Sequence, residues 1–274
     1  MKNNYMPITS EISNTGFVVT SDVYMYTTQI ANMYMLGDPA KDNDWIIIDT
    51  GMPGTLGRVK HAMNQRFGSN IGPKAIILTH GHFDHVGNLQ QLIKEWDEDI
   101  PVYAHSSELP HLTGKEDYPK ADPGAYKGLV AKMSPAFSRE AVDISEHIHA
   151  LPEDGSIPFF PEWTWHHTPG HTKGHVSLFR EKDRILLAGD AFVTVKQESL
   201  YKVMAQEPEL SGPPKYLTEN WSDAEASVKK LAGLNPETAL TGHGRMMEGE
   251  DLRSRLRDLS DHFVEKAVPK KEKK

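Results

Sequence analysis

Four residues that can bind metal ions or protons follow directly after one short apolar stretch of this sequence. The run 75–78 has the character of a buried strand, and His80, His82, Asp84 and His85 crowd into the six positions from 80 to 85. The two histidines alternate along an extended strand end, so both side chains can point the same way. The aspartate and the third histidine are expected to open the following helix. A polar turn that merely starts this helix is the alternative interpretation, but the pattern favours a metal site.

Three further candidate ligands stand in the same setting, each just after an apolar strand. His171 lies in the run TPGHTKGH, Asp190 in LLAGDAF and His243 in ALTGHG. Each of these turns would be ordinary by itself. Because all three share the strand-end position of the first cluster, we expect them to complete one site with it.

The composition limits which chemistry the site can carry. The chain has no cysteine, which excludes disulfides, thiol nucleophiles and thiolate ligands, so any metal must be held by histidine and carboxylate. A formal charge of -8 gives no general attraction to nucleic acid or to an anionic membrane. The N-terminus lacks the apolar core of a signal peptide, and no apolar run reaches membrane-spanning length. A cytoplasmic location is therefore expected.

The order of expected elements predicts an α/β fold in a single domain over residues 1–274. Strands dominate residues 11–49, a helix is expected over 55–67, and a second series of strands runs from about 147 to 188. A helix after Trp221 has a capping-box signal in Ser222 and Glu225, and an amphipathic terminal helix is expected at about 248–266. Such an order suits two sheets packed face to face with helices outside.

Two irregular segments interrupt this order. Prolines and glycines break the periodicity of residues 106–145, which we interpret as a lid-like insertion or a packed loop. A shorter irregular piece covers residues 195–217. Within the first segment the side chains that could line a substrate pocket, or pack in the loop, are Tyr118, Tyr126, Met133 and Phe137.

The series H-x-H-x-D-H, TPGHT-x-GH, GD and GHG resembles that of the metallo-β-lactamase-fold hydrolases, over about residues 15–247. The resemblance implies an αββα sandwich, two mixed sheets between helical layers, with two metal ions at one edge. It assigns one ion to His80, His82 and His171, the other to Asp84, His85 and His243, and Asp190 to both. Asp49 in IIIDTG would steady the ligand loop, and His175 is interpreted as a buried residue that supports or packs against the ligands.

The expected ligands, five imidazoles and two carboxylates, suit two divalent ions, most simply zinc, although iron or manganese would accept the same set. Such a site makes a metal-bound hydroxide available near neutral pH. Asp84 is placed to pass a proton to the leaving group. We therefore expect a hydrolase of an ester, thioester or lactone of a small molecule.

The motifs leave the branch of the superfamily open, within a group similar to glyoxalase II and the lactonases. The lack of cysteine excludes the lactamase branch with a cysteine ligand, and Val193 stands where the acyl-homoserine lactonases have a tyrosine. Two alternatives stay open: a mononuclear iron oxidoreductase resembling the persulfide dioxygenases, and a catalytically silent binding protein.

Overall fold

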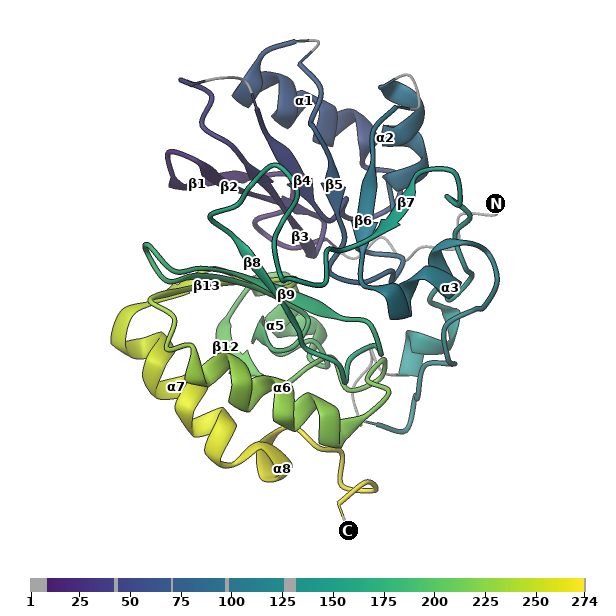
Figure 1. Cartoon of the computed structure of the whole chain (residues 1–274). Coiled ribbons are helices and arrows are strands. Elements are labelled where there is room, and N and C mark those ends of the chain that lie inside the picture. The colour runs from purple at the N-terminus through teal and green to yellow at the C-terminus, as the bar shows by residue number, and fades with distance from the viewer. Residues whose placement is uncertain (1–8, 42–43, 70, 97–98, 126–131, 274) are drawn as a thin grey trace.

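Two large β-sheets make up the centre of the molecule in the computed structural model (Figure 1), which describes residues 9–41, 44–69, 71–96, 99–125 and 132–273. The first sheet has seven strands in sequence order and the second five, in the order β14-β13-β10-β9-β8. A separate pair joins β11 and β12. The strands of the first sheet are β1 (Gly16–Thr20), β2 (Val23–Thr28), β3 (Ala31–Leu36), β4 (Ile46–Ile48), β5 (Ile76–Ile77), β6 (Val102–Ala104) and β7 (Ile148–Ala150). The others are β8 (Thr164–His167), β9 (Val176–Arg180), β10 (Ile185–Gly189), β11 (Val193–Val195), β12 (Pro208–Ser211), β13 (Thr238–Thr241) and β14 (Met247–Glu248).

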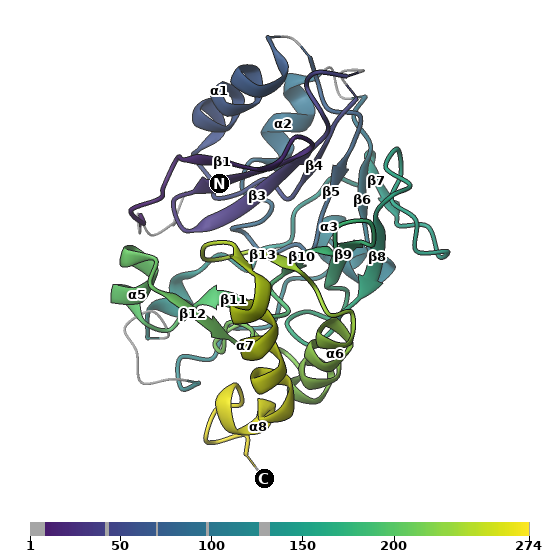
Figure 2. The ribbon, with the colours of Figure 1, turned by 90° about the vertical axis from the view of Figure 1, so that its left-hand side faces the viewer.

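Helices cover the outer face of each sheet, which gives four layers. Helices α1 (Leu56–Phe67) and α2 (Leu89–Glu95) lie over the first sheet, and α6 (Trp221–Gly233) and α7 (Gly249–Asp261) lie over the second (Figures 1 and 2). The short elements are η1 (Ser106–Glu108), α3 (Leu109–Leu112), η2 (Ser134–Ala136), α5 (Leu200–Ala205) and α8 (Phe263–Lys266). No helix among the described residues is both long and apolar enough to cross a membrane.

The alternation of side chains along the strands builds this layering. In β3, Met33 and Met35 join the cluster under α1 and α2, whereas Tyr34 and Leu36 join the cluster between the two sheets. Successive side chains of a strand point to opposite faces, so one buried strand serves two cores. The third cluster packs the other face of the second sheet against α6 and α7. The predicted αββα sandwich is confirmed.

Strand direction explains why one edge of the sandwich gathers the candidate ligands. Strands β4 and β5 are parallel, as are β10 and β13, and β8 runs with β10 because both are antiparallel to β9. The chain therefore leaves β8, β10 and β13 at the same end of the second sheet, and the contacts of His82 with His171 and of Asp84 with His243 place the end of β5 beside them. The segments that follow these four strands carry all the predicted ligands.

Two local predictions about helix starts are wrong. Asp84 and His85 lie in a turn, and α2 begins only at Leu89. The turn is held by Asn88, whose side-chain amide donates to the carbonyl oxygens of Thr50 and Met52, in the loop after β4, at 2.6 and 3.0 Å. Helix α6 is capped by Asn220 rather than Ser222, since the Asn220 side chain accepts from the two backbone N–H groups of residues 222 and 223.

The irregular segments are more ordered than their sequences suggest. Residues 195–217 include α5 and β12, and β12 pairs with β11. The insertion at 106–145 contains η1, α3 and η2, and its residues 126–131 lie outside the described part. At the C-terminus, α7 and α8 occupy the region expected to be one helix, with a break at His262.

Candidate metal centre

Three histidines from two loops bring ring nitrogens together at the sheet edge. His82 Nδ1 lies 3.0 Å from His80 Nε2 and 3.0 Å from His171 Nε2. The first two follow β5 and the third follows β8. All three side chains are buried, with at most 5% of their surface exposed. These histidines are the set that the resemblance assigns to one ion.

A second group lies beside the first and is joined to it by Asp190. The ligand atoms of Asp84, His85 and His243 lie within 4.8 Å of one another. One oxygen of Asp190, Oδ2, is 3.3 Å from His243 Nε2 and 3.4 Å from His171 Nε2. The other, Oδ1, is 3.7 Å from His85 Nε2. The carboxylate therefore faces both groups, as expected of a bridging ligand, and the structure brings together all seven residues proposed as ligands.

Hydrogen bonds behind two of these rings leave their Nε2 atoms facing Asp190. His85 Nδ1 contacts Asp49 Oδ2 at 2.8 Å, and His243 Nδ1 contacts the carbonyl oxygen of Ile30 at 2.9 Å. Because Nδ1 of each ring donates its proton to this oxygen, Nε2 is the atom that each ring can offer to a metal ion. His85 Nε2 and Asp190 Oδ1 are buried without any hydrogen-bond partner among the described residues. Buried carboxylates and imidazoles that lie this close need protons or cations between them, and imidazole with carboxylate is a donor set that fits metal ions.

The electrostatics of the two groups differ. Burial lowers the pKa of His82 to about 4 and that of His80 and His171 well below the ordinary value, so their neutral, metal-binding forms are favoured. Burial acts in the same direction on His243, but the carboxylates of Asp190 and Asp84 outweigh it and raise its pKa to about 10. In the metal-free protein the carboxylate-rich group therefore holds protons, which a cation would displace.

Asp49 and His175 lie behind the ligand atoms, where they can orient them. Asp49 Oδ1 accepts from the backbone N–H of Thr79 at 2.8 Å, and its Oδ2 accepts from the Thr79 hydroxyl at 2.7 Å, in addition to His85. Its backbone is in the left-handed region, with φ of 59°, a conformation that is uncommon outside glycine and is found at functional sites. His175 Nε2 accepts from the backbone N–H of Asp190 at 2.8 Å. Both placements agree with the supporting roles expected for these residues.

One buried residue at this edge has no signal in the sequence. Glu108, in η1, is fully buried and accepts hydrogen bonds from the loops that carry the first three histidines. Tyr118, predicted to line a pocket or pack in the loop, is packed and donates to Glu108. A single acid in an irregular segment gives no pattern to find, because its partners are backbone groups of distant loops.

A narrow cavity of about 20 Å³ opens beside Asp84, and its other walls are mainly apolar. Phe137, one of the predicted pocket residues, lines it, whereas Met133 lies half-buried at the start of η2 and Tyr126 lies outside the described residues. The cavity is lined by Ile30, Phe83, Asp84, Phe137, Gln197, Val203, Tyr216 and Leu217. It combines side chains from both irregular segments with a candidate ligand.

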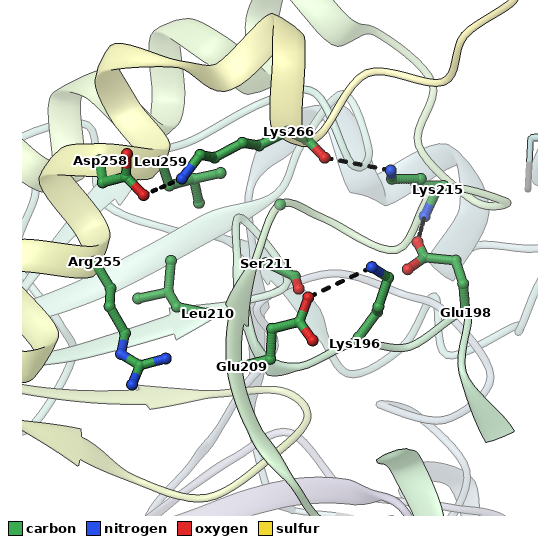
Figure 3. A pocket seen from close by; sticks show the side chains of 11 residues that line it. Lys196, Glu198, Glu209, Leu210, Ser211, Lys215, Arg255, Asp258, Leu259 and Lys266 are labelled. Atoms are coloured by element: carbon green, nitrogen blue, oxygen red, sulfur yellow. Dashed lines mark hydrogen bonds and ion pairs between the residues drawn. The ribbon is translucent and has the colours of Figure 1, made fainter. Parts of the chain in front are cut away.

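A larger cavity of about 380 Å³ lies between β12 and the terminal helices and has a different character (Figure 3). None of the seven candidate ligands lines it. Its charged groups contact one another: Lys196 pairs with Glu209 at 3.4 Å, Lys266 with Asp258, and Glu198 accepts from the backbone N–H of Lys215. Mutual pairing leaves this cavity a weaker candidate for chemistry than the histidine-rich edge.

Comparison with known proteins agrees with the geometry. The sequence model of the Metallo-beta-lactamase superfamily matches residues 26–243. YflN, a probable metallo-hydrolase of Bacillus subtilis, is 51% identical over 263 residues, which span 96% of this chain and 99% of that protein. BJP-1, a subclass B3 metallo-β-lactamase of Bradyrhizobium japonicum, aligns over 94% of both chains with a TM-score of 0.60 and 20% identity, which supports the fold alone. TTHA1623, solved in a di-iron-bound form, aligns over 80% of this chain and 89% of its own with a TM-score of 0.51 and 25% identity. The chain therefore belongs to the metallo-β-lactamase superfamily.

Proposed function

We propose that this protein is a metal-dependent hydrolase with a binuclear centre that cleaves an ester, thioester or lactone of a small molecule. The observation that carries the proposal is the position of Asp190, whose two oxygens face two separate groups of candidate ligands. The absence of cysteine and the buried histidines argue for hydrolysis without a covalent thiol intermediate.

Two divalent ions in this site, most simply zinc, would make a nucleophilic hydroxide available near neutral pH and would polarise a carbonyl group. Iron would accept the same ligands, and the di-iron form of TTHA1623 is a reason to test it here. The role of the chain would be to hold seven ligand atoms in place, with Nδ1 of His80, His85 and His243 hydrogen-bonded behind the rings.

Asp84 is the residue that we propose to move a proton. It lines the narrow cavity, and its Oδ2 lies 3.3 Å from His243 Nε2. Burial would raise the pKa of this carboxyl group, but His243 and His85 outweigh burial and lower it to about 2. In the metal-free protein the group is therefore ionised at neutral pH, and its carboxylate oxygens are the atoms that we propose to carry a proton to the leaving group.

At about 20 Å³ the cavity beside Asp84 has room for little more than a water molecule, and its mainly apolar walls would contact an uncharged part of a substrate that reaches Asp84. The described residues that line it include no lysine or arginine, and most are aliphatic or aromatic. Gln197 adds one polar contact: its side chain is 1% exposed, and Nε2 has no hydrogen-bond partner among the described residues. An unpaired buried donor at a substrate pocket is suited to an oxygen of the substrate.

The test is hydrolysis of a panel of esters, thioesters, lactones and β-lactams by zinc-loaded and by iron-loaded protein. We expect turnover of neutral acyl substrates that is lost on removal of the metal and falls about 100-fold or more in Asp84→Asn, which keeps the size of the side chain. Glu225→Gln, on the exposed face of α6, is the control and should keep full turnover.

Two results would contradict the proposed hydrolysis, and a third would remove only the proton transfer by Asp84. A single iron per chain with oxygen uptake in the presence of a thiol would favour an oxidoreductase. Two bound ions with no hydrolysis across the panel would favour a silent binding protein. Equal turnover in Asp84→Asn and wild type would remove the proposed proton transfer while leaving hydrolysis in place.

A further inference from the structure

Glu108 is a buried carboxylate whose every described hydrogen-bond partner is a donor. Its Oε1 accepts from the Thr172 hydroxyl at 2.5 Å and from the backbone N–H of Gly174 at 2.9 Å. Its Oε2 accepts from the backbone N–H of Gly81 at 3.1 Å and from the Tyr118 hydroxyl. The side chain is 0% exposed. Four donors to one carboxylate satisfy both oxygens and leave little freedom for the groups that donate.

The donors belong to the two loops that carry the three-histidine group. Gly81 lies between His80 and His82, and Thr172 follows His171 directly. The chain separation between His82 and His171 is 89 residues, so no local hydrogen bond fixes the distance between these loops. Glu108 contacts both loops at once and therefore links them, in addition to the backbone hydrogen bond from Val176 to the carbonyl oxygen of Thr79 at 2.9 Å.

The loops approach Glu108 so closely that side chains would not fit at two positions. A Cβ atom at Gly174 would lie 2.7 Å from Glu108 Cγ, and one at Gly81 would lie 2.5 Å from the Tyr118 hydroxyl oxygen. Both distances are below the closest contacts that carbon atoms tolerate. The sequence of both loops is thus adapted to contact with the Glu108–Tyr118 pair.

Tyr118 extends this link to the face of a candidate ligand. Its ring centroid is 4.6 Å from that of His82, and on its other side it stacks on His111 at 3.9 Å. The ring is 3% exposed. His82 therefore packs against a tyrosine whose hydroxyl is held by Glu108, which limits the rotation of the imidazole.

The second group of ligands is held by other residues. His85 is oriented by Asp49, and His243 by the carbonyl oxygen of Ile30. Neither contact involves Glu108 or Tyr118. A disturbance at Glu108 should therefore affect the two groups unequally.

We infer that Glu108 is a positioning residue that fixes the spacing between the His80–His82 loop and the His171 loop, and so sets the metal affinity of the three-histidine group. It contacts neither the ligand nitrogens nor the cavity beside Asp84. The inference rests on the metal centre of the proposed function but not on hydrolysis. Glu108 lies in η1, at the start of the insertion at 106–145, so this part of the insertion would hold the two ligand loops at a fixed distance.

The test compares metal binding in Glu108→Gln with that in wild type and in a matched control. Glutamine keeps the volume but places an NH2 group against a backbone N–H, so one loop loses its acceptor. Glu198→Gln is the control, because Glu198 is also a buried glutamate, 3% exposed, but accepts from Lys215 away from the ligand loops. Affinities are measured by zinc titration against a competing chelator, and anomalous diffraction assigns each ion to a group of ligands.

We expect zinc affinity at the three-histidine group to fall about 10- to 100-fold in Glu108→Gln, in line with the loss of other residues that orient ligands. Affinity at the group of Asp84, His85 and His243 should stay within about threefold of wild type, and Glu198→Gln should match wild type at both. Tyr118→Phe, which removes one hydroxyl group, should show a smaller loss at the same group and serves if Glu108→Gln does not fold.

Equal weakening of both groups, or no weakening of either in folded Glu108→Gln and Tyr118→Phe, would overturn the inference. So would a wild-type chain that binds no ion, which would overturn the proposed function as well. Selective loss at the three-histidine group in a protein that hydrolyses nothing would support the inference and contradict the proposed function.

Discussion

The two ends of β9 contain buried polar groups of opposite kinds. At its start, His175 accepts from the backbone N–H of Asp190, and the neighbouring atoms Asp190 Oδ1 and His85 Nε2 have no hydrogen-bond partner in the part of the chain that the structure describes. At its end, Arg180 is 1% exposed and makes two hydrogen bonds to Asp22, at 2.7 and 3.2 Å, and two to Asp183, at 3.0 and 2.6 Å.

The two ends of β9 differ in whether their charged groups pair with one another: those around Arg180 do, as in a structural cluster, whereas Asp190 Oδ1 and His85 Nε2 lack a hydrogen-bond partner among the described residues, as in a binding site. Around Arg180 every charge has its complement, and the guanidinium group also lies 4.7 Å from the ring of Trp163. At the other end, Asp190 and the imidazoles around it need protons or cations between them, and the protons can be displaced by bound metal ions. Both ends are buried and rich in titratable groups, so burial alone does not identify the functional end.

Removal of the carboxylate that we propose as the bridge between two ions should have the largest effect. Asp190→Ala is expected to lose one or both ions and to lower turnover at least about 100-fold, because both ligand groups lose a shared oxygen. The chain should still fold, since His175 accepts from the backbone N–H of residue 190. Elemental analysis measures the metal content and circular dichroism the fold. Full metal content in the variant would show that the end of β9 beside Asp190 does not depend on this carboxylate for metal binding.

Arg180→Met should act only on stability. It leaves two carboxylates without their partner, and loss of one partner from a buried ion pair lowers the free energy of unfolding by about 3–5 kcal/mol. The lower end is expected here, because the Asp22 and Asp183 side chains are 21% and 32% exposed. Denaturant unfolding gives the stability; a variant that keeps wild-type stability but loses metal would reverse the assignment of the two ends.

The pH dependence of stability should include a contribution from Asp22. Burial would raise its pKa, but hydrogen bonds from Arg180 and Thr20 and the charges of Arg180 and Lys182 lower it well below 3.8. A lowered folded-state pKa gives stability that is present above the unfolded pKa, here about 4, and is lost as the pH falls below it. In metal-free protein, the difference in Tm between wild type and Asp22→Asn should therefore shrink from pH 6 to pH 3. A difference that grows on acidification would contradict this assignment.

His262→Ala should have the smallest effect. The side chain of His262 is 54% exposed and contacts Asp258 at the break between α7 and α8. Surface substitutions of this kind change stability by about 0.5 kcal/mol or less. Wild-type metal content and turnover are expected, and a loss of metal in this variant would show that histidine number, rather than position, governs binding.

The candidate ligands and the strands before them could be predicted from the sequence because each motif is local. An apolar strand, a small residue and then a histidine or aspartate can be recognised at Asp190 and His243 without any knowledge of the fold. Their convergence at one edge followed from the family resemblance, and parallel strand directions explain it.

The interactions that span long distances in the chain could not be predicted. Glu108 reaches backbone groups of residues 81 and 174, and Arg180 reaches Asp22 across 158 positions. The helix cap at Asn220 was missed for a different reason, because two possible caps stood two residues apart and tertiary contacts decided between them. Backbone partners leave no pattern in a single sequence.

The central claim is that this sheet edge holds two neighbouring metal ions. Anomalous diffraction from crystals of the metal-replete protein tests it most directly. We expect two peaks, one contacted by His80, His82 and His171, the other by Asp84, His85 and His243, with Asp190 in contact with both. A single peak, or ions bound away from these residues, would contradict the account.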